Sequence, residues 1–258
     1  MRLLFLGTGT SQGVPMIGCD CAVCASADPR DRRCRSSLLI QGDRHILIDS
    51  GPDLRMQALA RGVKRLDAVV YTHCHNDHVM GFDDLRRFCE MTGRPLPVYG
   101  SAATLTALQR VFPYAFDPAL QVSTYVKAEP HEVVADREFH LGDTGLIPLT
   151  VPHGNTPTFG YIITVNGERR AAYLPDCTAM TEAMAERLRA IPLLIIDGLR
   201  ERPHPTHLNI SGAIAAARRV GARQTLLTHL THHVSHADRA QLLPAGVALA
   251  YDGLALDL

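Results

Sequence analysis

The sequence predicts a single α/β domain in which two sheets pack together and helices cover the outside. Two observations support this fold class. The chain has 258 residues, of which 46% are hydrophobic, enough for one large domain with a sizeable core. Short apolar runs alternate with helical patterns: strand runs come first, then strands separated by helices, then a second similar series. Because the chain has no long linker, low-complexity run or obvious repeat, we expect one domain over residues 1–258.

Strands are predicted where short runs rich in apolar and β-branched residues lie between turn residues. The candidates, in chain order, are residues 3–6, 37–40, 45–48, 68–71, 97–99, 145–151, 159–165, 170–174, 193–196, 224–228 and 247–251. Several of these runs are followed at once by a histidine or an aspartate. Loops at strand ends commonly carry function, so these polar residues are the ones to examine.

Helices are predicted where apolar residues recur with helical spacing. The candidates are residues 53–61, 83–90, 102–111, 178–189, 211–220 and 237–243. Gly62 follows the first of them, Asn209 precedes the fifth and Gly221 follows it. Glycine after a helix and asparagine before one are typical end signals.

Composition excludes several classes of protein. Lys+Arg and Asp+Glu balance at 26 each, which argues against a protein that grips nucleic acid through a broad basic surface. No run approaches the roughly 18 apolar residues of a membrane span. The first residues are broken too soon by Gly7 and Thr8 for a signal peptide. The seven cysteines are odd in number and three are crowded together, so we expect a cytoplasmic protein with reduced or metal-bound thiols.

The strongest functional signal follows the apolar run 68–71. His73, His75, Asp77 and His78 lie within six residues of one another, and they cannot all point into an apolar core. Imidazoles and a carboxylate in one tight loop carry a desolvation cost unless a cation joins them. A polar surface turn is the alternative interpretation, and a metal site explains the pattern better.

The pattern His73-x-His75-x-Asp77-His78 resembles the signature of the metallo-β-lactamase-fold hydrolases. His153, Asp176 and His229 match the later ligands of that family, and each comes just after an apolar run. The resemblance extends over the whole chain. The fold that it implies is an αββα sandwich.

The resemblance also implies a role for each matching residue. His73, His75 and His153 hold one ion, Asp77, His78 and His229 hold a second, and Asp176 bridges the two. Histidine and carboxylate ligands suit Zn, Mn or Fe, with Mn or Zn expected here. Asp49 matches an early aspartate of the family, and we expect it to orient a histidine ligand rather than bind metal itself. A simple turn aspartate at the end of a strand is the alternative.

The charge of such a centre favours an anionic substrate. Two divalent ions bring four positive charges, and Asp77, Asp176 and a bridging hydroxide remove three, which leaves about one. Two ions roughly 3.5–4 Å apart generate hydroxide near neutral pH and clamp both oxygens of a phosphoryl displacement. A phosphodiester therefore suits the site well, although a lactone, thioester or lactam also fits.

A second signal is the cluster Cys19, Cys21 and Cys24 in an N-terminal loop at about 18–35. Three thiolates within six residues can wrap one ion, and a structural zinc takes four nitrogen or sulfur ligands. Cys34 is a fourth ligand by sequence alone. The cluster resembles the PhnP type of the superfamily, the phosphodiesterases of the carbon–phosphorus lyase pathway. That resemblance points to His232 as the fourth ligand, with the adjacent His233 as its competitor.

The leaving group of a phosphodiester needs a proton donor. In PhnP-like proteins a histidine of the region after run 193–196 has this role, and His207 matches it better than His204 does. His207 and Asp77 are therefore the expected catalytic residues. Arg30, Arg32, Arg33 and Arg35 follow the cysteine cluster, either to bind phosphate or to pair with nearby aspartates.

We therefore expect a two-metal phosphodiesterase that hydrolyses a small phosphodiester, open-chain or cyclic, through a metal-bridging hydroxide. The cofactors are two divalent ions at the active site and one structural zinc. The resemblance alone suggests a homodimer, and we expect no membrane or nucleic-acid partner. Two alternatives remain: a PqqB-like metabolite-binding or carrier protein, and a thioester or lactone hydrolase of the same fold. Only 22 residues separate His153 from Asp176, too few for the basic arm of a tRNA-processing RNase Z.

Overall fold

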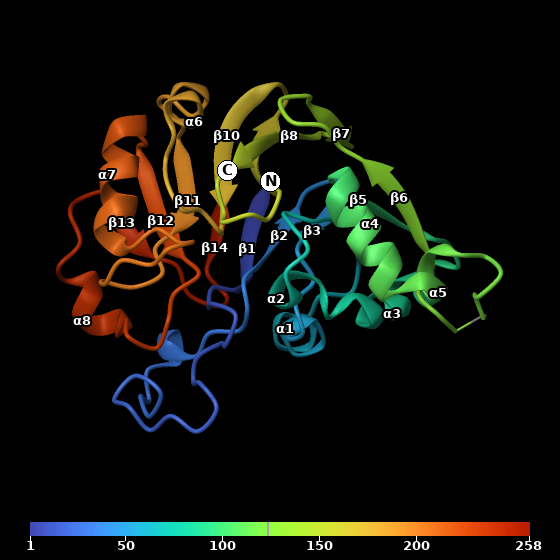
Figure 1. The fold of residues 1–258 in the computed structure, drawn as a ribbon, viewed down its shortest axis with the longest axis horizontal. Coiled ribbons are helices and arrows are strands. Elements are labelled where there is room, and N and C mark those ends of the chain that lie inside the picture. Colours follow the sequence, from blue (N-terminus) through green and yellow to red (C-terminus); the bar gives the residue numbers. More distant parts are fainter. Residues whose placement is uncertain (123) are drawn as a thin grey trace.

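A computed structural model describes residues 1–122 and 124–258. Two seven-stranded sheets lie face to face, and helices cover the outer face of each (Figure 1). The predicted αββα sandwich is confirmed. The N-terminal segment between the first two strands has little regular structure and extends beyond the sheets at the bottom of the view (Figure 1).

The first sheet has the strand order β14-β1-β2-β3-β4-β5-β6. Its strands β14, β1, β2 and β3 pair antiparallel, whereas β3, β4, β5 and β6 pair parallel. The bounds are β1 (Arg2–Gly7), β2 (Ser37–Gln41), β3 (His45–Ile48), β4 (Ala68–Val70), β5 (Leu96–Gly100), β6 (Ala128–Glu132) and β14 (Ala255–Asp257).

The second sheet has the order β13-β12-β11-β10-β9-β8-β7. Here β10 to β13 pair parallel, and β7 to β10 pair antiparallel. The bounds are β7 (Phe139–Leu141), β8 (Thr144–Val151), β9 (Thr158–Val165), β10 (Glu168–Leu174), β11 (Leu193–Asp197), β12 (Gln224–Thr228) and β13 (Val247–Leu249). The parallel strands β10, β11 and β12 therefore end at one edge, where Asp197 is the last residue of β11 and Asp176 and His229 follow β10 and β12.

Strand β1 shows why the central runs are continuously apolar. Successive side chains of a strand point to opposite faces of the sheet. Leu3 and Phe5 lie in the core between the two sheets, whereas Leu4 and Leu6 lie in the core under the helices. Both faces are buried, so neither set of positions tolerates a polar residue.

The helices divide between the two outer faces. Helices α1 (Leu54–Arg61), α2 (Asn76–Val79), α3 (Arg86–Thr92), α4 (Ala102–Val111) and α5 (Pro113–Phe116) cover the first sheet, and α6 (Glu182–Arg187) and α7 (Ile210–Val220) cover the second. Helix α8 (His236–Ala240) packs beside β13, and two 3-10 turns span Pro29–Asp31 and Phe82–Leu85. Asn209 caps α7 by accepting from the Gly212 amide, and Gly221 ends it in the left-handed conformation, as their positions predicted.

The structure differs from the predicted elements mainly at edges and ends. The helix predicted over 178–189 begins only at Glu182, because the Thr181 side chain caps it there. The helix predicted over 237–243 begins one residue earlier, capped by Ser235, and ends at Ala240. Strands β6, β7 and β14 were missed. They are short, lie at sheet edges and carry exposed residues, so they lack an apolar run.

Within the described residues, the helices are all too short or too polar to cross a membrane.

Candidate metal centre

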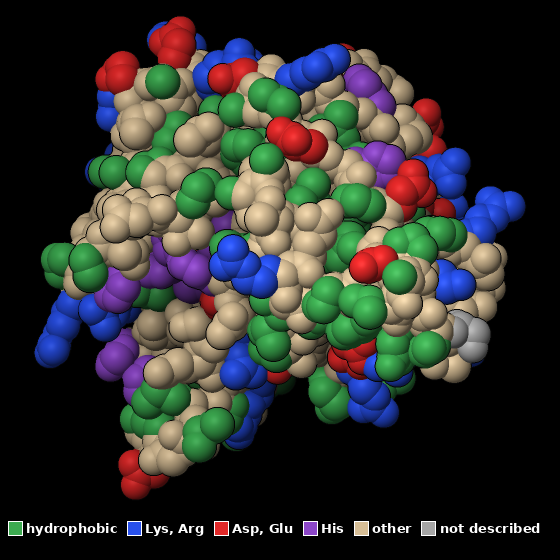
Figure 2. Space-filling view, turned by 45° about the vertical axis from the view of Figure 1, so that its right-hand side comes forward, with side chains coloured by type: hydrophobic (Ala, Val, Ile, Leu, Met, Phe, Trp, Pro, Cys, Tyr) green, Lys and Arg blue, Asp and Glu red, His purple; other side chains and the backbone are tan. Residues whose placement is uncertain are grey.

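The predicted ligand-type residues gather at one edge of the sandwich. His73 and His75 follow β4, and Asp77 and His78 lie on the single-turn helix α2. His153 follows β8, Asp176 follows β10 and His229 follows β12, so both sheets contribute. Figure 2 shows histidine side chains gathered on one side of the molecule, beside a projecting segment. Residues from four chain segments therefore meet at one place.

The first group of donor atoms is formed by three histidines. The Nδ1 atom of His75 lies 2.9 Å from Nε2 of His73 and 3.2 Å from Nε2 of His153. Asp176 faces the same group, with Oδ2 3.5 Å from Nε2 of His153 and 3.8 Å from Nε2 of His73. Three imidazole nitrogens and one carboxylate oxygen thus surround one point.

The second group shares Asp176 with the first. Nε2 of His78 lies 3.2 Å from Oδ1 of Asp176 and 3.4 Å from Oδ2 of Asp77. Nε2 of His229 lies 3.5 Å from Oδ2 of Asp176 and 3.6 Å from Oδ2 of Asp77. Because Asp176 reaches both groups, it stands where a bridging ligand would.

These side chains fit a pair of metal ions. Donors about 2.0–2.2 Å from a tetrahedral zinc lie about 3.3–3.5 Å from one another, close to the separations found here. Within the described chain, Nε2 of His78, Oδ1 of Asp176 and both ring nitrogens of His229 are buried without a hydrogen-bond partner. Buried polar atoms are normally satisfied, and a cation would satisfy all but Nδ1 of His229.

In three of the histidines, a hydrogen bond to Nδ1, the ring nitrogen that does not face the other donors, sets the orientation of the ring. Nδ1 of His78 donates to Asp49 at 2.7 Å, and Nδ1 of His153 donates to the Thr206 carbonyl at 2.9 Å. Nδ1 of His73 lies 2.9 Å from the Thr72 hydroxyl, which itself donates to Asp49. Each of these contacts favours the tautomer whose Nε2 carries a free lone pair.

The ring of His75 is held through Nε2 instead, so that its Nδ1 is the free donor atom. Its Nε2 lies 3.0 Å from the Thr156 hydroxyl, which leaves Nδ1 free to face His73 and His153. Asp49 makes the contact with a histidine that the sequence led us to expect. Thr72 and Thr156 were not singled out, because a threonine beside a histidine has no distinctive sequence signal.

The electrostatics of the cluster also call for a cation. Burial acts to lower the pKa of His78, but Asp176, Asp77 and Asp49 raise that pKa well above its ordinary value. Burial similarly opposes protonation of His229, yet Asp176 and Asp77 raise its pKa to about 9. Two buried carboxylates therefore need positive charge beside them, which metal ions supply without protonating the ligands.

Two glycines allow α2 to approach the loop after β3. The Ser50 amide donates to the His78 carbonyl, and the Gly81 amide donates to the Ser50 carbonyl, both at 2.9 Å. A Cβ atom on Gly51 would lie 2.1 Å from the Asp77 carbonyl oxygen, and one on Gly81 would lie 2.1 Å from the Gly51 carbonyl oxygen. Larger residues would push Asp49 away from His78.

His207 lies beside the cluster and is held by a buried aspartate. Its Nδ1 donates to Oδ2 of Asp197 at 2.7 Å, and its ring stacks on His229 with centroids 4.7 Å apart. Asp197 also accepts from the Cys177 and Leu199 amides, so its own position is fixed. Asp197 was not among the residues predicted to have a role. Its position at the end of an apolar strand, like that of Asp176, was the available signal.

Two cavities open beside this cluster. The first has a volume of about 230 Å³ and is lined by residues of both donor groups together with Ser11, Asn155, Thr156 and His207. The second, of about 240 Å³, also includes Ser11 and His207 in its wall, so the two adjoin. His204 lines the second cavity but not the first. Among the two expected proton donors, only His207 faces both.

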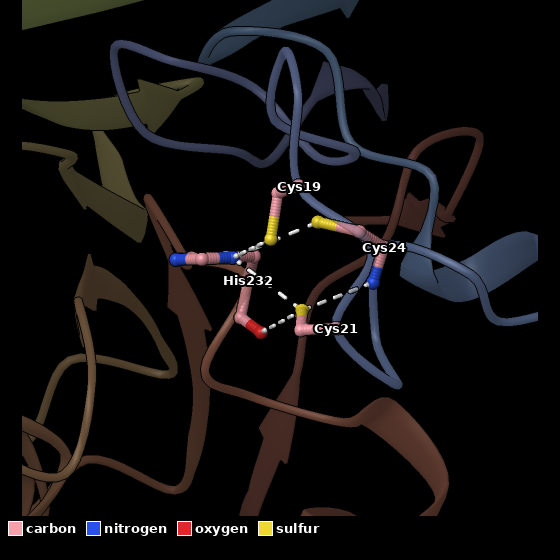
Figure 3. A group of neighbouring side chains, drawn as sticks. All are labelled: Cys19, Cys21, Cys24 and His232. Carbon is pink, nitrogen blue, oxygen red and sulfur yellow. Dashed lines mark hydrogen bonds between the residues drawn. The ribbon is translucent and has the colours of Figure 1, made fainter.

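The three clustered cysteines converge on His232 (Figure 3). Nδ1 of His232 lies 3.2 Å from Sγ of Cys19, 3.5 Å from Sγ of Cys21 and 3.6 Å from Sγ of Cys24. With Zn–S near 2.3 Å and Zn–N near 2.0 Å, ligands of one zinc lie about 3.5 Å apart. The amide of Cys24 donates to Cys21 and lowers the pKa of its thiol to about 6, which favours the thiolate.

The competing residues lie outside this group. His233 is exposed and contacts Thr231, and Cys34 does not belong to the cluster. Of the four arginines, Arg30 pairs with Asp28, Arg35 pairs with Asp53, and Arg33 is buried. None of the four, Arg32 included, lines either cavity.

Comparison with known proteins gives consistent matches. The family profile of the β-lactamase superfamily domain matches residues 44–230. A crystal structure described as a new diphosphatase from the PhnP family superposes with a TM-score of 0.90 at 41% identity, covering 100% of this chain and 97% of that one.

Two curated relatives differ in how much of them is matched. An octanoyltransferase from Porphyromonas gingivalis is 41% identical over 98% of this chain, but the chain spans only 51% of that protein. A coenzyme PQQ synthesis protein B from Methylorubrum populi is 27% identical over the full length of both.

Proposed function

Because the chain belongs to the β-lactamase superfamily, we propose that it is a two-metal phosphodiesterase that acts on a small substrate. The resemblance to the PhnP type is confirmed by the 41% identity to the PhnP-family diphosphatase. The fold and the His/Asp cluster support a metal-dependent hydrolase. The observation that carries the finer proposal is the sharing of Asp176 by two donor groups, since paired ions suit phosphoryl transfer.

In this proposal each donor group holds one divalent ion, Mn or Zn. His73, His75 and His153 form the first site. Asp77, His78 and His229 form the second, and Asp176 belongs to both. When bound, the two ions supply Lewis acidity and a water that ionises near neutral pH.

The remaining chemistry belongs to the chain. Water oxygen forms a bond to phosphorus and releases a proton to solvent, and the bond from phosphorus to the leaving oxygen breaks. His207, protonated on both ring nitrogens, donates the proton of Nε2 to that oxygen. Asp197 accepts from Nδ1 of His207 and so aims Nε2 at the leaving oxygen. The products are a phosphomonoester and an alcohol, so one water is consumed.

The first cavity limits the size of the substrate. Its volume of about 230 Å³ suits a phosphoryl group with a small substituent. The balance of acidic and basic residues and the absence of arginines 30–35 from the cavity wall support a small molecule rather than a nucleic acid.

A diphosphate diester is a second candidate substrate. The PhnP-family relative of 41% identity is described as a diphosphatase, which favours cleavage of a phosphoanhydride bond. The same donors would serve, because attack on phosphorus is common to both reactions. The leaving phosphate is a weaker base than an alkoxide, so this reaction would depend less on His207.

We further propose that Cys19, Cys21, Cys24 and His232 bind a structural zinc. All four positions are filled by the protein, which is the arrangement of a structural rather than a catalytic site. Such an ion would tie the N-terminal loop to the loop that carries His229, because His232 is three residues further along the chain.

A turnover assay tests the proposed function. Metal-reconstituted protein is given bis(p-nitrophenyl) phosphate or p-nitrophenyl phosphate, with Mn and Zn each tried. We expect clear diester turnover and little monoester turnover. His75→Ala should abolish it with folding retained, whereas the exposed His140→Ala should not. Absence of turnover despite three bound ions per chain would favour a thioester or lactone hydrolase or a PqqB-like carrier.

A further inference from the structure

The second cavity is lined without a single carboxylate. Its wall consists of Thr10, Ser11, Gln12, Gly13, Met16, Leu199, Arg200, His204, His207, Thr231, His232 and His233. Arg200 is the one permanently charged residue of this wall, and a guanidinium stays protonated at any ordinary pH. The cavity is therefore electropositive and rich in hydrogen-bond donors, which suits an anion.

Arg200 keeps its charge available to a ligand. Its Nε and Nη2 atoms contact only the carbonyl oxygens of Arg202 and Pro203, at 3.4 and 3.3 Å. Among the described residues no carboxylate lies within ion-pair distance of Arg200. The neighbouring Glu201 is paired instead with Arg239 at 2.9 Å.

Backbone hydrogen bonds hold the wall of this cavity together. Three loops that form it are joined by backbone hydrogen bonds: Thr10 donates to Leu230 and Thr231 donates to Leu199, at 3.2 and 3.0 Å. The carbonyl of Arg200 accepts from Ile210 at the start of α7. Such a wall would bind a ligand with little loss of conformational freedom.

The position of His207 indicates which part of the substrate the second cavity would bind. It lines both cavities, and the proposed proton donor must stand beside the leaving oxygen. The atoms beyond that oxygen must therefore continue past His207. The second cavity lies there.

We infer that this second cavity binds an anionic group carried by the leaving portion of the substrate, with Arg200 as its fixed positive charge. The group is a phosphoryl or a carboxylate, because both match the fork of a guanidinium. The inference rests on the proposed function, since it takes His207 as the proton donor. It predicts a substrate with two anionic groups on either side of the bond that breaks.

The kinetic test compares three methyl aryl phosphates with intact, metal-loaded protein. The aryl groups are phenyl, 3-carboxyphenyl and 3-(phosphonomethyl)phenyl, and methyl phosphate release is followed by phosphorus NMR. We expect kcat/KM to be at least about tenfold higher for one or both charged substrates, since a hydrogen bond between two charged groups is stronger than one between neutral groups. The two charged arms distinguish a carboxylate from a phosphoryl group.

Two variants locate the effect. Arg200→Gln should remove most of the preference for the charged substrate, whereas Arg202→Gln should preserve it, because Arg202 does not line the cavity. Equal loss on charged and uncharged substrates in Arg200→Gln, or no preference in the unaltered protein, would overturn the inference.

A binding measurement separates this inference from the proposed function. The probe is 3-(phosphonomethyl)phenol, the leaving portion alone, titrated calorimetrically into the same three proteins. We expect Arg200→Gln, but not Arg202→Gln, to weaken binding at least about tenfold. If no diester is hydrolysed yet this difference is found, the proposed function fails and the anion site stands. Equal binding of the probe by all three proteins would contradict the inferred anion site.

Discussion

The two clusters of candidate metal ligands differ in the structure that supports their histidines. In the His/Asp cluster the donors come from the ends of strands in both sheets, and hydrogen bonds to Asp49, Thr156 and Thr206 set the orientation of their rings. In the Cys/His cluster three donors come from one irregular loop. The first cluster opens to a cavity, whereas the second is completed by protein atoms.

The supporting structure therefore distinguishes the two clusters as clearly as their donor types do. A site that must hold a substrate needs an open position and donors fixed by a rigid scaffold. A site that joins two loops needs four protein donors and little else. His229 and His232, three residues apart, belong to different sites because only His229 directly ends a strand.

The largest expected effect comes from Asp176, the residue shared by both donor groups. Asp176→Asn should lower kcat at least about 1000-fold and reduce the bound metal by one ion or more per chain, because a bridging charge is lost. Activity and metal content by mass spectrometry are the measurements. Asp143→Asn, at an exposed position, is the control. Full activity in Asp176→Asn would contradict the two-metal proposal.

Replacement of His207 should show a dependence on the leaving group. His207→Gln should lower kcat about 100- to 10,000-fold on methyl phenyl phosphate, whose leaving group needs a proton. On bis(p-nitrophenyl) phosphate the loss should be less than about tenfold, since nitrophenolate leaves unaided. His204→Gln should spare both reactions if His207 is the donor. Equal losses for both substrates in His207→Gln would assign it a merely structural role.

The Cys/His cluster should respond more weakly in catalysis than in stability. Cys21→Ser should remove one zinc per chain, lower kcat by about tenfold or less and lower Tm by about 4–8 °C, the change expected for a loss of about 2 kcal/mol. Cys34→Ser, outside the cluster, is the matched control. A loss of activity as large as that of Asp176→Asn would mean that the two clusters are one functional unit.

A smaller effect concerns the buried contacts that hold the N-terminal loop against the C-terminal part. Arg33 donates to the Thr8 hydroxyl, to the Ala250 carbonyl and to Nδ1 of His236, and the His236 amide donates to Asp31. Burial, together with the charge of Arg33, lowers the pKa of His236 to about 4. In the folded protein, His236 is therefore neutral at neutral pH.

The pH dependence follows from this pKa. The unfolded chain binds a proton near pH 6.5 and the folded chain only near pH 4, so stability is full above pH 6.5 and falls as pH decreases toward 4. His236→Asn keeps an acceptor for Arg33 without titrating. The unaltered protein should lose about 1–2 kcal/mol more than this variant between pH 7 and pH 5, measured by denaturant unfolding. Burial raises the pKa of Asp252 to about 6, an opposing effect that is common to both proteins and cancels. Parallel stability profiles would contradict the prediction.

Much of the fold could be predicted because its strands are buried on both faces. Runs such as Leu3 to Leu6 and Leu193 to Ile196 are apolar at every position, so they stand out without knowledge of their partners. The edge strands β6, β7 and β14 could not be found in this way. Pro130 and charged neighbours interrupt β6, and its pairing with β5 is decided by distant residues.

The residues of the candidate site likewise fall into two groups, those that could be predicted from the sequence and those that could not. The four residues of the His73 motif and the three cysteines lie within a few positions of one another, so their spacing alone indicates shared chemistry. By contrast, Asp197 is ten positions from His207, and only the packing of β11 against the loop before α7 brings them together. Likewise, the spacing of the ligands left His233 as a competitor of His232, and the backbone of the loop after β12 turns His232 inward and leaves His233 exposed.

The sandwich, the family resemblance and the donor types of each cluster could therefore be predicted, because they depend on local apolar runs and closely spaced ligands. Three features emerged only in the folded chain: Asp176 faces both donor groups, Asp197 orients His207, and a cavity without carboxylates lies beyond it. These features join residues that are distant along the chain. Contacts between residues that are far apart in sequence arise from packing of whole sheets and loops, which no short pattern of residues encodes.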